Sequence, residues 1–515
     1  MTIYITQGLR KSARQTPNKI ATIFAGVQQN FTVLQQRVAS FANALQTQGL
    51  KPGDRVSIIA LNSASYMEVM LGTYWAGGVI SPLNTRWKLT DFIYALNNSA
   101  TSILVLDQQF AYLAPELKQA CPTIHTIICD TLVPEQSNYL HYESLIGRHS
   151  PVADAERKGD ELAMILYTSG TTGYPKGVML SHQNLISIAI GQQAIGCGTQ
   201  GDRYLHVAPM FHMADIQLML NHMLNGGTHV ILPNFTPADT LASIVTDKVT
   251  DILMVPSMIH MLVNHPDVEQ YDLSQLQTIF YGAAPITQKA LELAMNKLSN
   301  CQFIQGYGMS ETGLLSMLPA KYHTVEGLAL NKLKSAGRAT ALIELKIVDA
   351  NGQEVAAYEV GEIAAKGPAI MQGYWQAPEQ TAKVLYDGWL HTEDAAYMDE
   401  EGFIFIVDRL KDMIVTGGEN VYSSEVENAL AQHPSVAMCA VIGIPDEKWG
   451  ETIHAAIVLR PDNSTTIEEL VTHCKQLISD YKCPRSIDFV LDLPLSAAGK
   501  IMKNELRKNR VNADG

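Results

Sequence analysis

Short apolar runs alternate with amphipathic helical patterns over most of the first part of the 515-residue chain. Val38, Phe41 and Leu45 share one face of a helix that we expect to begin at a Thr32 cap and to close at Gly49. This alternation predicts an α/β architecture of largely parallel sheets with helices on both faces. A second helix is expected at about 64–75, and buried strands at 56–60, 79–81, 103–106, 125–128, 229–232, 252–255 and 278–281.

The pattern changes at about residue 335, where strand signals predominate. Apolar and β-branched residues gather at 343–348, 361–366 and 402–407. The dipeptide Asn351-Gly352 between the first two of these runs is typical of a hairpin turn. A small β-barrel or β-rich subdomain is therefore predicted at about 335–408.

A charged connector at 408–412 separates this subdomain from the last part of the chain. The terminal segment is typical of a βαβ unit, with Thr465 and Glu468 as the capping box of its helix. We therefore predict two domains, a large one at 1–410 and a small α+β one at 411–515.

Length and composition exclude several classes of protein. A chain of 515 residues is too long for one core, and 47% hydrophobic with 17% charged residues is typical of a globular enzyme. The formal net charge of −14 argues against a nucleic-acid partner. The seven cysteines form no Cys-x-x-Cys pair, which fits a reducing cytoplasm. Since the chain has no run of ~18 apolar residues and no signal-peptide pattern, we expect no transmembrane segment and a cytoplasmic location.

The stretch 167–178 is the strongest candidate for a phosphate-binding loop. It follows an apolar run at 162–166, and backbone N–H groups, hydroxyls and a lysine are suitable partners for a phosphate chain. A Walker loop is excluded because Lys176 precedes a further apolar strand, after which Ser181 is expected to cap a helix. The loop offers Thr168, Ser169, Gly170, Thr171, Thr172, Gly173, Lys176 and Gly177.

A second cluster occupies 305–313. Glu311 and Thr312 stand where a dinucleotide fingerprint and a nucleophile elbow respectively require glycine. What remains is a Gly-Tyr-Gly platform at 306–308, on which a base can stack, followed by a carboxylate suited to Mg²⁺. The alternative is the first turn of a helix capped by Ser310.

Three further stretches are ambiguous when each is considered alone. Asp394 ends an acidic turn, Asp408-Arg409 is compatible with a surface ion pair, and Lys500 lies in a loop of small residues. Together with the two clusters above, they follow the order and spacing of the adenylate-forming superfamily. The chain resembles this family, which includes acyl-CoA synthetases, peptide-synthetase adenylation domains and beetle luciferases, over nearly its whole length.

The resemblance implies that a carboxylate reacts with ATP to give an acyl-adenylate and pyrophosphate, after which the acyl group passes to a thiol. Residues 168–176 would embrace the β- and γ-phosphates, with Thr168 and Glu311 as Mg²⁺ ligands. Ser310, at a position where threonine is commoner, would bond a phosphate oxygen. Lys500 would bridge the carboxylate and the α-phosphate. The adenine and ribose would be bound by Gly282, Ala283, Ala284, Gly306, Tyr307, Gly308, Asp394 and Arg409.

The resemblance also implies a second conformation for the thiol step. Lys411 matches the hinge about which the small domain rotates. Gly417 and Gly418 would line a narrow CoA tunnel on the newly presented face. One departure from the family pattern concerns the ribose site, where Glu393 occupies a position that is usually glycine.

The substrate pocket is implied to include His212, Ala214, Asp215 and Gly306. His212 matches an aromatic position that gates carboxylate access, and since amino-acid adenylation domains carry aspartate there, an amino-acid substrate is not expected. Asp215 would meet a polar substrate group or, as the alternative, serve as a solvated or capping aspartate. Ala214 and Gly306 leave room for a sizeable acyl or aryl group.

These observations favour an ATP-dependent acyl-CoA ligase for a medium- or long-chain fatty acid or an aryl carboxylate. Its expected partners are the carboxylate, ATP, Mg²⁺ and CoA, with a homodimer as a further option. The alternatives are an acyl-AMP ligase that loads an acyl carrier protein, a catalytically silent nucleotide-binding protein and, with less support, a luciferase-like oxygenase.

Overall fold

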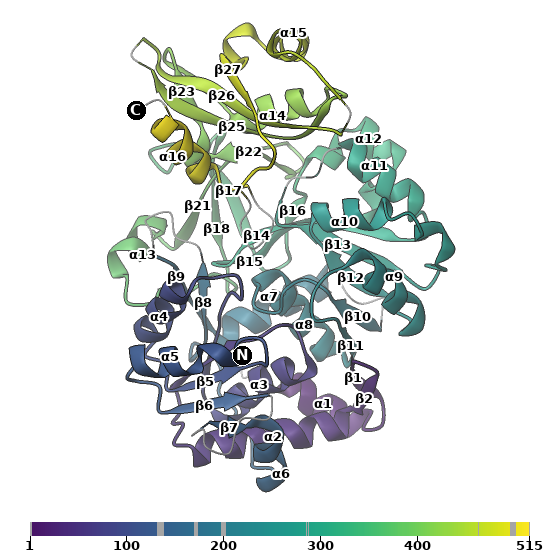
Figure 1. Cartoon of the computed structure of the whole chain (residues 1–515), viewed down its shortest axis with the longest axis vertical. Coiled ribbons are helices and arrows are strands. Elements are labelled where there is room, and N and C mark those ends of the chain that lie inside the picture. Colours follow the sequence, from purple (N-terminus) through teal and green to yellow (C-terminus); the bar gives the residue numbers. More distant parts are fainter. Residues whose placement is uncertain are drawn as a thin grey trace. The chain divides into compact units, whose positions relative to one another are not determined.

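The computed structural model describes residues 3–130, 139–168, 174–196, 202–284, 286, 288–446, 448–461, 463–494 and 501–513. The chain divides into two compact units (Figure 1). The first unit contains Met1–Leu345 and Ala365–Leu390, and the second contains Lys346–Ala364 and His391–Gly515. Lys411 lies inside the second unit, so its role as a domain boundary and hinge stays a prediction.

The first unit contains a nine-stranded sheet in the order β16-β15-β14-β13-β12-β10-β11-β1-β2. Its central strands are parallel, and antiparallel pairs close both ends. The strands are β1 (Ile20–Phe24), β2 (Val27–Asn30), β10 (Arg203–His206), β11 (Thr228–Ile231), β12 (Asp251–Met254), β13 (Thr278–Gly282), β14 (Gln302–Met309), β15 (Gly313–Leu318) and β16 (Arg338–Ala339).

The first unit also contains an eight-stranded sheet in the order β19-β9-β8-β4-β3-β5-β6-β7. It is parallel from β8 to β7, whereas β8, β9 and β19 pair antiparallel. The strands are β3 (Arg55–Ile59), β4 (Val79–Pro82), β5 (Ile103–Leu106), β6 (Thr126–Cys129), β7 (Leu140–His141), β8 (Leu162–Thr168), β9 (Lys176–Ser181) and β19 (Gly373–Tyr374). The predicted α/β architecture is confirmed.

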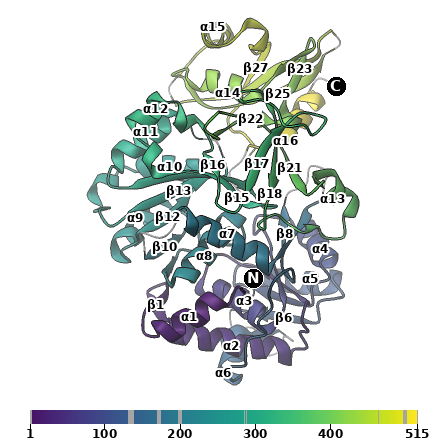
Figure 2. The ribbon, with the colours of Figure 1, turned by 180° about the vertical axis from the view of Figure 1, so that it is seen from behind.

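Helices cover these sheets, as the two opposite views in Figures 1 and 2 show. The central helix α3 is buried along nearly its whole length, and α7 packs against α8. The helices are α1 (Gln7–Gln15), α2 (Phe31–Thr47), α3 (Ala64–Ala76), α4 (Leu89–Asn98), α5 (Ala114–Ala120), α6 (Tyr142–Arg148), α7 (His182–Ala194), α8 (Met213–Asn225), α9 (Pro237–Thr246), α10 (Pro256–Val263), α11 (Gln288–Lys297), α12 (Val325–Ala329) and α13 (Pro378–Val384).

Helix caps are predicted less accurately than the helices themselves. The cap of α2 is Asn30, whose Oδ1 accepts a hydrogen bond from Val33 N at 2.9 Å. Thr32 lies in the first turn instead, so the predicted cap was wrong. Ser181 does cap α7, accepting from Asn184 N at 3.1 Å, as expected.

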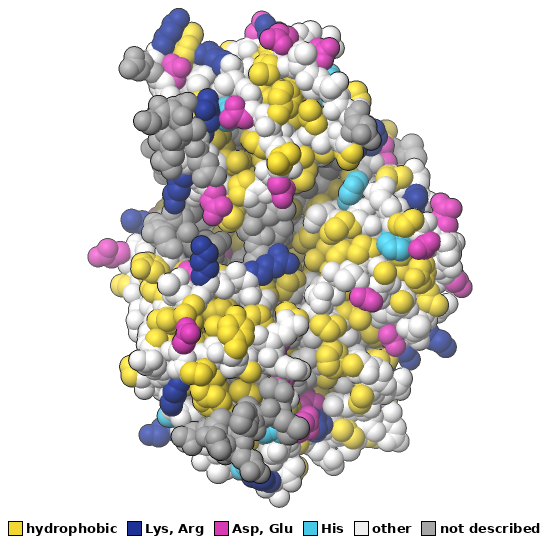
Figure 3. Space-filling view, viewed as in Figure 1, with side chains coloured by type: hydrophobic (Ala, Val, Ile, Leu, Met, Phe, Trp, Pro, Cys, Tyr) yellow, Lys and Arg dark blue, Asp and Glu magenta, His cyan; other side chains and the backbone are white. Residues whose placement is uncertain are grey.

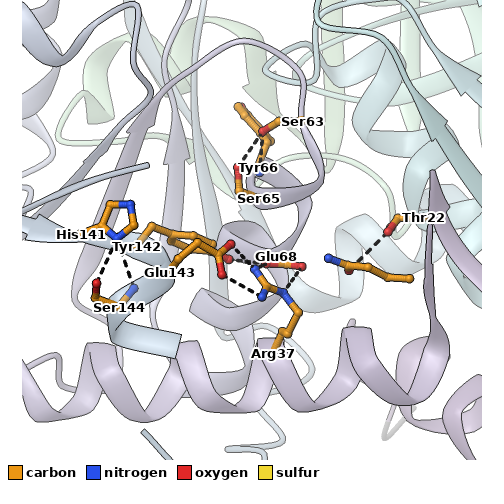
Figure 4. A network of polar contacts seen from close by, with 11 residues as sticks. Thr22, Arg37, Ser63, Ser65, Tyr66, Glu68, His141, Tyr142, Glu143 and Ser144 are labelled. Carbon is orange, nitrogen blue, oxygen red and sulfur yellow. Dashed lines mark hydrogen bonds and ion pairs between the residues drawn. The ribbon is translucent and has the colours of Figure 1, made fainter. Parts of the chain in front are cut away.

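A buried polar network joins three helices of the first unit (Figure 4). Arg37 of α2 places its Nε 2.7 Å from Oε1 of Glu68 on α3, whose side chain has no exposed surface. Tyr142 of α6 donates its hydroxyl to Oε2 of Glu68 at 2.6 Å. Glu143 accepts a further bond from Arg37 at 2.6 Å. Removing one partner of such a buried charge pair typically costs about 3–5 kcal/mol.

The second unit has its own strands and core. Most of the five-stranded sheet of β17, β18, β20, β21 and β22 belongs to it, as does the five-stranded sheet β24-β23-β26-β25 with β27 beside β26. The elements are β17 (Glu344–Val348), β18 (Gly361–Lys366), β20 (Leu385–Tyr386), β21 (Trp389–Met398), β22 (Ile404–Arg409), β23 (Ile414–Thr416), β24 (Glu419–Val421), α14 (Ser423–Ala431), β25 (Val436–Asp446), β26 (Gly450–Leu459), α15 (Ile467–Leu477), β27 (Ser486–Phe489) and α16 (Lys503–Ala513).

Two sequence predictions for the second unit can be compared with the structure. The segment β26-α15-β27 is the predicted βαβ unit, with β26 and β27 parallel. The capping box of α15 consists of Thr466 and Glu469, so the predicted pair of Thr465 and Glu468 was wrong by one residue. Thr465 donates its hydroxyl to Glu469 at 2.9 Å.

Surface charge and membrane character complete the description. On the face shown in Figure 3, acidic and basic side chains are interspersed, with hydrophobic atoms between them. Among the residues that the structure describes, no helix combines the length and apolar character needed to cross a bilayer.

Candidate active site

The hairpin β8–β9 frames the predicted phosphate loop. Thr168 at the end of β8 pairs with Lys176 at the start of β9. The connecting residues Ser169, Gly170, Thr171, Thr172 and Gly173 lie outside the described residues. The strand-to-strand setting is as predicted, and Gly177 is needed because an added Cβ would lie 2.8 Å from Cγ2 of Ile165. Thr168 and Lys176 thus stand side by side where the loop leaves the sheet.

A tyrosine from a distant segment connects the two predicted clusters. Tyr374 of β19 pairs with Val178 of β9. Its hydroxyl donates to Oε1 of Glu311 at 2.9 Å, and Nζ of Lys176 lies 5.0 Å from the centroid of its ring. The structure therefore brings Lys176 and Glu311 to one aromatic side chain, the lysine over its ring and the carboxylate at its hydroxyl.

Glu311 is held in a tight turn between β14 and β15. Its backbone carbonyl accepts from Met371 N at 2.8 Å, and the residue is 7% exposed. The turn is closed by Thr312, whose N donates to Met309 O at 3.2 Å and whose Oγ1 accepts from Met309 N at 3.2 Å. Since the segment joins two strands, the alternative of a helix start capped by Ser310 is excluded.

The chemistry of Glu311 fits the implied Mg²⁺. Within the part of the chain that the structure describes, no three His, Cys, Asp or Glu side chains gather as a metal-binding group. A single buried carboxylate beside a phenol hydroxyl suits a hard cation that takes most of its oxygens from phosphates and water. Glu311, with the Thr168 hydroxyl as the second predicted ligand, is therefore compatible with Mg²⁺ bound through a nucleotide.

The predicted adenine surface is built from backbone at the ends of β13 and β14. Gly282 pairs with Gly306, and a Cβ on Gly282 would lie 2.1 Å from the carbonyl oxygen of Gly306. A Cβ on Gly308 would lie 1.8 Å from Gly313 O. Ala283 follows with a φ of +63°, in the left-handed region. These glycines leave the ends of two adjacent strands without side chains, next to half-buried Tyr307 and Ala284.

An apolar cluster lies between α8 and the nine-stranded sheet. His212 is the N-cap residue of α8, and its ring centroid lies 5.0 Å from that of Phe211. Ala214 packs against this cluster, and a Cβ on Gly306 would lie 2.6 Å from Cδ1 of Leu314, another of its members. We call it the acyl cluster; it consists of Ile195, Tyr204, Ala208, Ala214, Leu218, Leu253, Phe280, Ile304, Leu314, Met317 and Ala320.

Asp215 points into the protein instead of toward solvent. Its Oδ1 accepts from the Tyr204 hydroxyl at 2.9 Å, and its Oδ2 lies 2.7 Å from Nδ1 of His206. Nε2 of His206 in turn lies 2.9 Å from Nδ1 of His229. Burial, together with nearby His206, lowers the pKa of His222 to about 3, so this ring stacks on Tyr204 in its neutral form. The arrangement favours an anchoring role for Asp215 in the first turn of α8 over contact with substrate.

The predicted ribose residues form an ion pair in the second unit. Asp394 and Arg409 are paired on β21 and β22, with Arg409 Nε 2.8 Å from Asp394 Oδ1. Glu393 has a φ of +60°, which explains why glycine is usual there. Its backbone N donates to Oε1 of Glu362 at 2.8 Å, which supports the strained conformation.

The predicted CoA glycines form a turn between β23 and β24. Gly417 and Gly418 have φ values of +62° and +86°. Gly417 N donates to Trp449 O at 2.8 Å, and an added Cβ would lie 2.8 Å from the indole. The guanidinium carbon of Arg485 lies 4.2 Å from a ring centroid of Trp449, and Nζ of Lys448 lies 4.8 Å from it. A partly exposed indole flanked by two cations thus adjoins the glycine turn.

Two predicted site residues remain, Lys411 and Lys500, and the structure describes only the first. Lys411 is exposed in the short 3-10 turn Leu410–Asp412 between β22 and β23. Lys500 lies outside the described residues. Neither Tyr374 nor Trp449 is indicated by a sequence pattern, although the Lys448-Trp449-Gly450-Glu451 stretch is an unusual setting for a tryptophan.

Known proteins match the chain over most of its length. The family model described as AMP-binding enzyme matches residues 9–375, and the AMP-binding enzyme C-terminal domain matches 425–500. The chain is 35% identical over 500 residues to a feruloyl-CoA synthase of Amycolatopsis sp, covering 97% of each protein. It is 33% identical to the fatty acid–[acyl-carrier-protein] ligase ScoC of Streptomyces coeruleorubidus, covering 96% of this chain and 94% of ScoC. ATP-bound MatB from Rhodopseudomonas palustris is a structural neighbour, with a TM-score of 0.89, 28% identity and coverage of 98% of this chain and 99% of MatB.

Proposed function

The chain belongs to the AMP-binding enzyme family, and on that premise we propose that it is an ATP-dependent acyl-CoA ligase. It converts a carboxylate and ATP into an acyl-adenylate and pyrophosphate, and then forms the thioester with CoA while AMP leaves. The observation that carries the proposal is the placement of Lys176 over the ring of Tyr374 and of Glu311 at the hydroxyl of the same side chain.

This placement suits the first step. Attack of a carboxylate on the α-phosphorus increases negative charge on the phosphate oxygens, so fixed positive groups lower the barrier. Lys176 supplies one such charge beside the phosphate loop, and Mg²⁺ held by the nucleotide and Glu311 would supply further neutralisation. Tyr374 fixes the Glu311 carboxylate, which limits the reorganisation needed when the nucleotide binds.

The second unit supplies two features for the second step. Trp449, Lys448 and Arg485 offer an aromatic surface and two cations to the phosphates of free CoA, next to the Gly417-Gly418 turn. We place the hinge of the proposed domain rotation at Lys411, which is exposed in a one-turn connector. The similarity to ScoC supports a second candidate, the loading of a carrier-protein phosphopantetheine.

The acyl cluster supports a substrate with an apolar body. It is formed by aliphatic and aromatic side chains and packs against two small residues, Ala214 and Gly306, the second of which lies directly against Leu314. A carboxylate at the position of His212, as needed for an amino group, is not present. We therefore propose a medium- or long-chain fatty acid or an aryl carboxylate.

A carboxylate panel tests these proposals. We expect ATP–pyrophosphate exchange with fatty or aryl acids, and thioester formation when CoA is added. Adenylate that accumulates with CoA but transfers to a phosphopantetheinylated carrier protein would support the second candidate instead. Absence of exchange with every acid, in folded protein that binds ATP, would favour a silent nucleotide-binding protein.

A further inference from the structure

A cavity of about 220 Å³ opens beside the end of β15 in the first unit. Its lining combines the apolar side chains of Ile195, Met317 and Pro319 with those of Lys321, Tyr322 and Arg338, which we call the polar wall. No carboxylate is among the described residues that line it.

The strand register relates this cavity to the acyl cluster. Gly306 of β14 pairs with Met317 of β15, and Met317 pairs with Arg338 of β16. Directly paired residues project from the same face of a sheet, and neighbouring strands lie about 4.8 Å apart. Arg338 is therefore about 10 Å from Gly306 across the sheet, on the face to which Gly306 belongs. Met317 is shared between the acyl cluster and the cavity.

The polar wall is organised around one tyrosine. Arg338 donates from Nη2 to the Tyr322 hydroxyl at 2.9 Å, and Nζ of Lys321 lies 5.0 Å from the Tyr322 ring centroid. A guanidinium and an ammonium on one wall attract anionic oxygens, and the planar guanidinium is especially suited to a carboxylate.

We propose that this cavity binds an anionic oxygen group, above all a second carboxylate, at the end of the substrate opposite to the activated carboxylate. The proposal rests on the proposed ligase function and narrows its substrate class. Gly306 borders the site where the reacting carboxylate is expected, Met317 covers the apolar middle of the substrate, and Arg338 and Lys321 receive its distal end. No residue of the cavity takes part in the chemistry of adenylation.

Matched acids test the proposal. The specificity constant for ATP–pyrophosphate exchange is measured for straight-chain dicarboxylic acids and for monocarboxylic acids of the same length. The wild-type enzyme is expected to prefer the dicarboxylic member at the chain length that reaches Arg338. Arg338→Met should reduce this preference by about tenfold or more, the scale of one hydrogen bond between charged partners, and Lys321→Met should reduce it less.

Two controls separate binding from folding. Lys334→Met removes an exposed charge of the same unit that does not line the cavity, so it should leave the preference unchanged. Exchange with the matched monocarboxylic acid reports whether each variant is folded and active.

Tyr322→Phe is a further test variant, which removes only the hydroxyl that accepts a hydrogen bond from Arg338. It should weaken the preference for the dicarboxylic acid, as Arg338→Met does.

The outcomes distinguish this proposal from the proposed function. If monocarboxylic acids are activated but Arg338→Met leaves the preference unchanged, the distal site is disproved and the ligase function stands. If no acid of either series supports exchange, the ligase function itself fails, and the distal site with it.

Discussion

Glycines form the predicted nucleotide surface of the first unit and the predicted CoA surface of the second, but Gly282 and Gly308 of the first and Gly418 of the second are required for different physical reasons. In the first unit, a Cβ on Gly282 or Gly308 would lie 2.1 or 1.8 Å from a backbone oxygen. In the second unit, a Cβ on Gly418 would meet nothing within 4 Å, and glycine is favoured there by a φ of +86°. Gly282 and Gly308 are thus required by close packing and Gly418 by backbone conformation. Gly417, with a φ of +62° and the Trp449 indole 2.8 Å from an added Cβ, is subject to both requirements.

The charged site residues of the two units also differ in how far their side chains are exposed to solvent. Glu311 is 7% exposed and bonded to Tyr374, whereas the Arg409 side chain is 38% exposed. Lys411 is also exposed, in a short turn. The comparison indicates that Glu311 is fixed by packing. Arg409 and Lys411 lie at the surface, where the proposed domain rotation would let them exchange partners, whereas Asp394 of the same unit is buried.

Gly308→Ala should have the largest effect. Because the added Cβ would overlap Gly313 O at 1.8 Å, the hairpin that carries Glu311 must shift. We expect ATP–pyrophosphate exchange to fall by more than about a hundredfold, since small displacements of positioning groups are that costly. Thermal unfolding should also move to lower temperature. Near-normal exchange in this variant would show that the packing of the first unit is not required.

Tyr374→Phe should have the next largest effect. It removes the hydrogen bond to the Glu311 carboxylate, and a bond of this charged type is worth about 1.5–3 kcal/mol. We expect exchange to fall by about ten- to a hundredfold, with a higher Mg²⁺ requirement. Tyr112→Phe is the matched control, because Tyr112 is 72% exposed. Equal behaviour of the two variants would argue against a positioning role for Tyr374.

Burial in the first unit also predicts acid sensitivity. Burial, with a contribution from Arg157, lowers the pKa of His182 to about 4 from its usual 6.5. The unfolded chain therefore binds the proton more readily, and His182 should lower the free energy of unfolding by about 2 kcal/mol between pH 7 and pH 5. Half-buried Asp130 and buried Asp251, whose pKa values are raised to about 6 chiefly by desolvation, act in the opposite direction.

Urea unfolding at both pH values checks this prediction by comparison with His182→Gln. The variant should lack the His182 share of the pH dependence, while the contribution of the two aspartates stays the same in both proteins. An identical pH dependence in the variant and the wild type would contradict the lowered pKa.

Gly418→Ala should have the smallest effect. The substitution meets no neighbour, so its cost is the strain of a left-handed conformation, about 1 kcal/mol. We expect a small decrease in Tm and nearly unchanged rates for both half-reactions. A loss as large as that in Gly308→Ala would remove the distinction between the two kinds of glycine.

The sequence predicts the local elements well and the long-range contacts poorly. Apolar runs revealed β8 and β9, because the hydrophobic pattern is a property of neighbouring residues. The caps of α2 and α15 were misplaced since Asn30 and Thr32, or Thr465 and Thr466, are both competent cap residues. Only tertiary structure decides between them.

The site residues that were missed depend on strand pairing. Tyr374 reaches Glu311 across 63 positions of sequence, through the two-residue strand β19, which is too short to show a periodic pattern. From the sequence, Asp215 was considered as a contact for a polar substrate group because it follows His212 by three residues, with a solvated or capping aspartate as the alternative. Its partner His206 lies on the neighbouring strand β10, and that adjacency becomes visible only in the folded protein.

Separate measurement of the two half-reactions tests the central claim most directly. Lys500→Ala should abolish ATP–pyrophosphate exchange while largely retaining the conversion of supplied acyl-adenylate and CoA into thioester. Trp449→Ala should show the reverse, with exchange retained and thioester formation reduced. Equal loss of both half-reactions in Lys500→Ala would contradict an enzyme that uses different faces of its second unit for the two steps.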